Sequence, residues 1–362
     1  MKNNLKNAIA LSLIFQIIFV IWLSKEPEIV ETYYSNGIYP VISQFFRILF
    51  GWLPFSVGEI VYTLIFIVAI RYIILNWKRI KAFPWSFVRN VFVVLAVFYF
   101  TFNLLWGLNY YRQPIAERFD IRDSITSQEV VDLAEELIEK TNSIHFQITR
   151  DTAQMVQVPY DRNEIFTKTI EGYREIEKEL PFLKYRHPSL KKSMFSILDS
   201  YMGIGGYLNP FTNEAQVNAL TPVFRFPVVS GHEVGHQVGY SKENETNFIG
   251  YLVTSKNKDI YFQYAASAYA LSHCLSAIRR GDEEKFQELF SKINFGVQEN
   301  YRELYEFNIR YANPFEPIFK SIFDTFLKAN QQVEGVRSYG KIVELMVGYH
   351  EKHPIGSELY GN

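Results

Sequence analysis

Two histidines four residues apart enclose a glutamate in the segment 231–236, which reads GHEVGH. On a helix, residues at this spacing lie on one face, so the imidazoles of His232 and His236 can bind the same Zn²⁺. Glu233 would then lie where it can accept a proton from a water molecule. The pattern predicts a catalytic metal centre, with two histidine ligands and a general base. Two unrelated surface histidines on a helix are the alternative.

A zinc centre of this kind needs a third protein ligand, and two acids follow the motif. A histidine six residues after His236 would give the metzincin pattern, but Lys242 stands there, which excludes that subclass. Helical phasing places Glu245 among apolar side chains and Glu243 among small or polar ones. A carboxylate among apolar groups must be paired, protonated or metal-bound. We therefore expect Glu245 to be the third ligand of one zinc ion per chain, and Glu243 to be a solvated acid near the helix start. A salt bridge at Glu245 is the alternative.

Two further features bear on a peptide substrate. Ala215, Gln216 and Val217 precede the metal motif and are expected to form an edge strand against which an extended peptide could lie. An ordinary core strand fits these residues equally well. Hydrolysis also needs a donor for the developing oxyanion, and Arg337 and Tyr339 are candidates, although a structural role is the alternative for a tyrosine in a chain with 24 of them.

Three apolar runs precede the motif and would anchor it. They cover about residues 8–23, 57–77 and 91–108. A bilayer core of about 30 Å needs roughly 20 mostly apolar residues, so each run is a candidate transmembrane helix. Buried core helices are the alternative for all three. The first could also be a signal peptide, but it lacks the small residues of a cleavage site.

Charges in the connecting segments predict how these helices are oriented. Lys2 and Lys6 precede the first run, and the 78–90 loop carries four cations. The positive-inside rule places both segments in the cytoplasm. We therefore expect residues 1–108 to be a membrane anchor and residues 109–362 to be an extracytoplasmic domain. For a bacterial protein, this means the inner membrane with a periplasmic domain.

Periodicity predicts a helix-rich α+β domain with few strands. The expected helices cover about 126–140, 163–180, 245–280, 282–308, 314–330 and 338–349. The expected strands cover 194–201 and 215–220. The expected fold class is therefore three N-terminal transmembrane helices followed by a helix-rich α+β domain, and the histidine motif predicts that this domain is a zincin-like metallopeptidase domain.

Charge and cysteine content exclude several classes of protein. The formal net charge is −1, so no basic field is present to bind nucleic acid. Cys274 is the only cysteine, which excludes an intramolecular disulfide framework and a cysteine-rich zinc module. The expected partners are the lipid bilayer and a peptide or protein substrate that the sequence does not identify.

The chain resembles an uncharacterised family of bacterial multi-pass membrane zincins, known only as a domain of unknown function. The resemblance is carried by GHEVGHQVGYSKENETNFIGYL, by the preceding PFTNEAQVN and by the late FLKANQQVEGVRSYGKIVELMV. It extends over the three apolar runs. The helix after the motif in that family reads like E-x-E-A-N-F, and here Thr246 replaces the alanine. The resemblance implies a metallopeptidase-like fold and a membrane location, and no substrate.

These observations together predict a membrane-anchored zinc metallopeptidase that hydrolyses peptide bonds outside the cytoplasm. The alternative is a non-catalytic membrane scaffold or binding protein on a zincin fold. Retention of Glu233 favours the enzyme, because a structural zinc site needs no general base.

Overall fold

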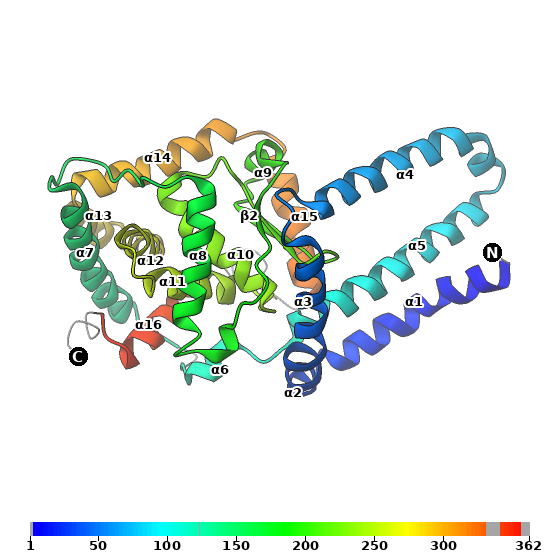
Figure 1. Cartoon of the computed structure of the whole chain (residues 1–362), viewed down its shortest axis with the longest axis horizontal. Coiled ribbons are helices and arrows are strands. Elements are labelled where there is room, and N and C mark those ends of the chain that lie inside the picture. Colours follow the sequence, from blue (N-terminus) through cyan, green and yellow to red (C-terminus); the bar gives the residue numbers. More distant parts are fainter. Residues whose placement is uncertain (1–2, 123, 331–340, 356–362) are drawn as a thin grey trace.

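Three long apolar helices project from one side of a larger helical body (Figure 1). The computed structural model describes residues 3–122, 124–330 and 341–355. The apolar helices are α1 (Asn3–Leu23), α4 (Val57–Ala82) and α5 (Pro84–Leu105), and each is long and apolar enough to cross a membrane. The expectation of three apolar helices is confirmed, with different bounds: α1 begins earlier than residue 8, and α4 continues beyond residue 77. Helix α5 begins at Pro84 and ends at Leu105, earlier at both ends than expected.

The segment between α1 and α4 forms helices of its own, and these pack against the larger body. It contains α2 (Pro27–Ile29), the π-helix η1 (Val30–Ile38) and α3 (Tyr39–Phe50). The chain after α5 continues as the 3₁₀ helix η2 (Gly107–Tyr111). Side chains from the end of α1, from these segments and from strand β2 (Gly206–Asn209) form one buried cluster: Val20, Leu23, Val30, Tyr34, Tyr39, Trp106, Tyr110, Tyr111 and Leu208. The first 108 residues therefore share a core with the domain that follows them.

A buried ion pair closes this junction. Arg112 donates two hydrogen bonds of 2.8 Å to the two carboxylate oxygens of Glu31, and Arg118 also contacts this carboxylate. Burial alone would raise the pKa of Glu31, but its bonds to Arg112 and Arg118 and their charges outweigh burial and lower the pKa to about 2. The ion pair links η1 to the segment that follows α5.

We expect Glu31 to make the protein sensitive to acid. Its pKa lies below the ordinary 4.5, so its contribution to stability is complete above pH 4.5 and is lost as the pH falls towards 2. The shift corresponds to about 3 kcal/mol at neutral pH. Thermal unfolding of the full chain in detergent, measured from about pH 5 to about pH 2.5, should show a larger loss of stability in the wild type than in Glu31→Gln. Equal losses would contradict this expectation.

The strands form one small sheet in the order β1-β3-β2. Strand β3 (Glu214–Val217) is central; it pairs in parallel with β1 (Leu190–Lys192) and antiparallel with β2 (Gly206–Asn209). The sheet is bonded to the start of α4, because the Glu214 carboxylate accepts hydrogen bonds from the backbone N–H groups of Val57 (3.1 Å) and Gly58 (2.7 Å). The expected strand at 194–201 is wrong: this stretch contains helix α9 (Ser196–Met202).

Helices make up the rest of the body. They are α6 (Ile115–Phe119), α7 (Ser127–Thr149), α8 (Arg162–Ile176), η3 (Pro181–Leu183), η4 (Val223–Arg225), α10 (Phe226–Gln237), α11 (Glu243–Ser255), α12 (Ile260–Gly281), α13 (Glu283–Ser291), α14 (Phe295–Tyr311), α15 (Glu316–Ala329) and α16 (Ile342–Lys352). Capping boxes begin α7 at Thr126 and α8 at Asp161. The main core lies between α7, α10, α11, α12 and α16. The expectation of a helix-rich body with a small sheet is confirmed.

Candidate metal centre

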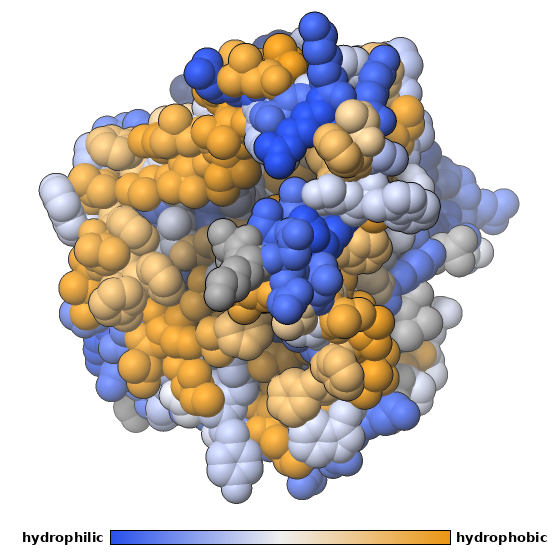
Figure 2. All heavy atoms as spheres, turned by 90° about the vertical axis from the view of Figure 1, so that its right-hand side faces the viewer, coloured by the Kyte–Doolittle hydropathy of each residue, from blue (hydrophilic) through white to orange (hydrophobic). Residues whose placement is uncertain are grey.

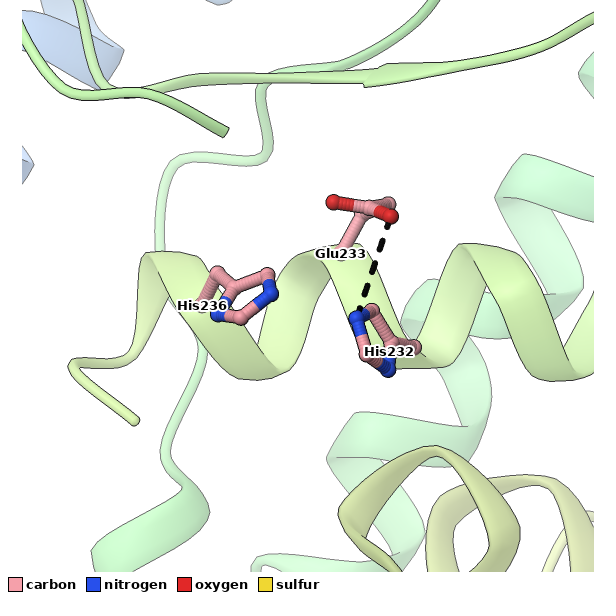
Figure 3. A group of neighbouring side chains, drawn as sticks. All are labelled: His232, Glu233 and His236. Carbon is pink, nitrogen blue, oxygen red and sulfur yellow. Dashed lines mark ion pairs between the residues drawn. The ribbon is translucent and has the colours of Figure 1, made fainter. Parts of the chain in front are cut away.

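Helix α10 carries the histidines on neighbouring turns of one face, with Glu233 beside them (Figure 3). The two imidazole rings have their centroids 4.7 Å apart and lie nearly perpendicular, at 88°. One donor atom from each of His232, Glu233 and His236 lies within 4.8 Å of the others. The predicted pair of histidines and its neighbouring carboxylate are therefore brought together on a buried helix.

Glycines let α10 and α11 approach closely. A Cβ at Gly250 would lie 2.9 Å from the carbonyl oxygen of Val228 and 3.0 Å from the backbone nitrogen of His232. A Cβ at Gly231 would lie 3.3 Å from the Cα of Gly250. This backbone contact brings the first turn of α11 beside the two imidazoles.

Residues from the segments next to the apolar helices bind the C-terminal end of α10. Tyr39 and Arg47 donate to the carbonyl of Gln237 over 2.9 and 3.4 Å. The Trp106 indole donates to the carbonyl of His236 over 3.3 Å. These are carbonyls that a helix end leaves without an intrahelical partner, and a cation there also complements the helix dipole. The segments next to the apolar helices therefore help to hold α10 in place.

The turn after α10 selects the tautomer of His236. The chain reverses at Gly239, whose φ of 96° suits glycine, and Arg112 donates to the Gly239 carbonyl over 2.8 Å. The reversal places the Tyr240 carbonyl 2.7 Å from His236 Nδ1. Because a carbonyl only accepts, Nδ1 carries the proton and Nε2 keeps its lone pair for a metal. Burial lowers the pKa of His236 to about 4, so the ring is neutral at pH 7.

Glu243 is the acid that lies at the histidines. Its carboxylate oxygens are 3.4 Å from His232 Nε2 and 3.8 Å from His236 Nε2. Two ligand atoms about 2.0–2.1 Å from a tetrahedral zinc lie about 3.3 Å apart, so these separations fit three ligands of one ion. The expectation that Glu243 faces water is wrong, since its residue is only 7% exposed.

Glu245 lies elsewhere. Its carboxylate accepts a hydrogen bond from the backbone N–H of Ile115 over 3.1 Å and lies 3.6 Å from Lys242 Nζ. Apolar neighbours do not distinguish the two acids, because α11 is buried on nearly every side and both acids lie in its first turn. The salt bridge that was the alternative for Glu245 is present, and the geometry favours Glu243 over Glu245 as the third donor.

Glu233 lies in a setting suited to proton transfer. Burial raises its pKa, the charges of Glu243 and Asp199 raise it further, and His232 opposes them, which leaves the pKa at about 8. Strand β2 passes close by, since a Cβ at Gly206 would lie 2.6 Å from Glu233 Oε1. In the absence of a bound cation, the buried carboxyl group therefore holds a proton near neutral pH.

Several buried polar atoms around the histidines have no hydrogen-bond partner among the described residues. They are His232 Nδ1, Glu233 Oε2 and Asn247 Nδ2. Buried polar groups are normally satisfied, so a group of unsatisfied ones marks a place for an ion or water. Together with the donor set of two imidazoles and a carboxylate, they fit a zinc ion with a position left open.

Asn247 is a residue of this centre that sequence reasoning missed. Burial lowers the pKa of His232, but the Glu243 carboxylate, with smaller contributions from Glu233 and from the Asn247 side chain, outweighs burial and raises it. Asn247 lies four residues after Glu243 and so on the same helical face. That spacing was the available signal, and it repeats the spacing of the two histidines on α10.

The predicted substrate strand lies close to Glu233, since a Cβ at Gly206 would lie 2.6 Å from the Gln216 carbonyl oxygen and also 2.6 Å from Glu233 Oε1. Ala215, Gln216 and Val217 lie in β3, which is paired on both sides, so the predicted edge strand is wrong. Strand β2, beside Glu233, is an edge of the sheet instead. Arg337 and Tyr339 lie outside the described residues, so their predicted role stays a prediction.

Comparison with known proteins identifies a family whose function is unknown. The family described as "protein of unknown function (DUF3810)" matches residues 34–347, which include α10, α11 and two of the three apolar helices. The match begins after α1, later than the sequence resemblance suggested. No curated protein and no solved structure matches the chain.

Proposed function

The chain belongs to the DUF3810 family, and from its metal centre and apolar helices we propose that it is a membrane-anchored zinc metallopeptidase with a zincin-like domain. The observation that supports this best is the convergence of His232, His236 and Glu243 beside the buried Glu233 carboxyl group, whose Oε2 has no hydrogen-bond partner among the described residues. A purely structural zinc site would have no use for this fourth group.

The proposed mechanism assigns one task to each side chain. His232, His236 and Glu243 would hold one zinc ion, which when bound would supply a Lewis acid and lower the pKa of water. Glu233 accepts a proton from the attacking water and then donates it to the leaving amine. The Tyr240 carbonyl keeps the His236 ring in the tautomer that leaves Nε2 free.

Metal analysis and peptide hydrolysis of the full-length protein in detergent test this proposal together. We expect about one zinc per chain, and hydrolysis of an unbiased peptide mixture that stops on chelation and returns with added zinc. A bound zinc without any hydrolysis would favour the non-catalytic scaffold. Absence of bound metal, or hydrolysis that survives chelation, would overturn the proposed function.

We further propose that the metal centre lies outside the cytoplasm. Lys78, Arg79 and Lys81 lie in the last turns of α4, and Arg89 lies near the start of α5. The positive-inside rule keeps these neighbouring helix ends in the cytoplasm. The ends of α1 and α5 that join the larger body would then lie on the outer side. A reporter fused after Lys81 should behave as cytoplasmic and one fused after Phe119 as exported. The reverse result would place the metal centre in the cytoplasm.

A further inference from the structure

Helix α3 has its polar side inside and its apolar side outside. Arg47 and Ser43 are buried against the body of the protein. Val41, Phe45 and Ile48 point outward and are 71%, 61% and 57% exposed. An amphipathic helix on a water-soluble protein buries its apolar face instead. The exposed face of α3 therefore has the character of a surface that meets lipid.

Helix α9 is inverted in the same way. It buries Ser196, Asp199 and Ser200. It exposes Ile197 and Leu198, which are 65% and 53% accessible. Both helices bury polar residues and expose apolar ones, although they are far apart in the sequence. This indicates that their exposed faces meet the same kind of environment.

Helix α15 adds a third apolar face. Phe315, Ile318, Ile322, Phe323 and Phe326 recur at helical spacing, and each is exposed by more than a third of its surface. Most of this face has no cover from the described part of the chain. Continuous apolar surface of this kind is rare on a protein that meets only water.

The three helices surround the place where the apolar helices enter the body (Figure 1). Helix α3 is followed within a few residues by the start of α4. The backbone N–H of Met194, just before α9, donates to Glu59 in the first turn of α4 over 3.0 Å. The Phe326 ring of α15 lies 6.2 Å from that of Phe102, near the end of α5.

The same side of the molecule presents hydrophobic residues over much of its area when viewed from the apolar helices (Figure 2). The exposed faces of α3, α9 and α15 therefore continue the lipid-facing surface of the three helices. A separate protein partner would have to cover three faces that are already contiguous with membrane-spanning segments.

We propose that α3, α9 and α15 form an interfacial collar that lies in the headgroup and upper acyl region of the bilayer leaflet next to the metal domain. Helices with one strongly apolar face bind in this layer, and Trp52, at the end of α3, is a residue type that favours it. The occupant is lipid of the same membrane that the apolar helices cross. The proposal does not depend on zinc or on catalysis.

Spin labels at single introduced cysteines test the collar directly. Cys274 is the only cysteine and is buried, so labels attach selectively at Ile48→Cys, Leu198→Cys or Ile322→Cys. Phe146→Cys is the matched control, because Phe146 is also an exposed apolar residue, 46% accessible, but lies on α7 away from the apolar helices. Each full-length variant is placed in phosphatidylcholine–phosphatidylglycerol liposomes, and collisions with oxygen and with a water-soluble nickel chelate are measured.

The collar predicts a ratio of oxygen to nickel collisions that is severalfold higher at the three collar positions than at the control. A ratio at all three positions equal to that of Phe146→Cys would place them in water and overturn the proposal. Low collision rates with both reagents would show that a protein covers these faces, which also overturns it. Because the control and test positions are all exposed, loss of folding is not expected in any variant.

Discussion

Glu233→Gln should abolish peptide hydrolysis and leave zinc bound. Glutamine keeps the size of the side chain but cannot accept the proton, and general-base catalysis typically contributes about 10²–10⁴-fold to the rate. Zinc content should stay near that of the wild type, because the proposed ligands His232, His236 and Glu243 are unchanged. Zinc analysis and initial hydrolysis rates on the same preparation measure both effects.

His232→Ala is the matched control for this result. It removes a proposed ligand and should lose zinc and hydrolysis together, whereas Glu233→Gln should lose only hydrolysis. If Glu233→Gln retained most of the activity, Glu233 would not be the base. If it lost the metal as well, Glu233 would be better described as a ligand.

Glu243→Gln should lose zinc, whereas Glu245→Gln should keep it. Glu243 lies 3.4 and 3.8 Å from the two imidazole nitrogens, and glutamine replaces its anionic oxygen with a neutral group. The loss of affinity should exceed the ~10–100-fold that follows from removing a partner outside the ligand set. Competition with a calibrated zinc chelator measures the two affinities.

Glu245→Gln should instead affect stability. Its carboxylate accepts from the Ile115 N–H and lies near Lys242, so replacing a charged acceptor by a neutral one should cost about 1 kcal/mol of folding free energy. Zinc loss confined to Glu245→Gln would restore the ligand that helical phasing chose. Unchanged affinity in both variants would exclude both acids as ligands.

The sequence was sufficient for those features that depend on local composition. Runs of apolar residues identified α1, α4 and α5, because length and hydropathy alone decide whether a helix can span a membrane. The spacing of His232 and His236 placed both on one helical face, and this expectation is met on α10. Most helices of the larger body were found from their periodicity.

Several failures arose where the surroundings of a helix differ from those that a water-soluble protein would give it. Helix α9 turns its apolar residues outward, so its pattern resembled a strand. Helix α3 does the same and was missed. Helix α11 is buried on nearly all sides, so apolar neighbours could not distinguish Glu243 from Glu245. A sequence does not state which surface meets lipid, water or protein, and phase arguments need that information.

The bonds at the C-terminal end of α10 constrain how the molecule can be assembled. Tyr39, Arg47, Trp106 and Arg112 all precede α10 in the chain, so they are synthesised before the helix whose end they bind. Domains form from the N-terminus during translation, and the insertion of the apolar helices therefore comes first. In the proposed membrane protein, α10 would then fold against segments that membrane insertion has already put in place. A chain that failed to insert would lack those contacts, so the proposed activity would depend on correct insertion.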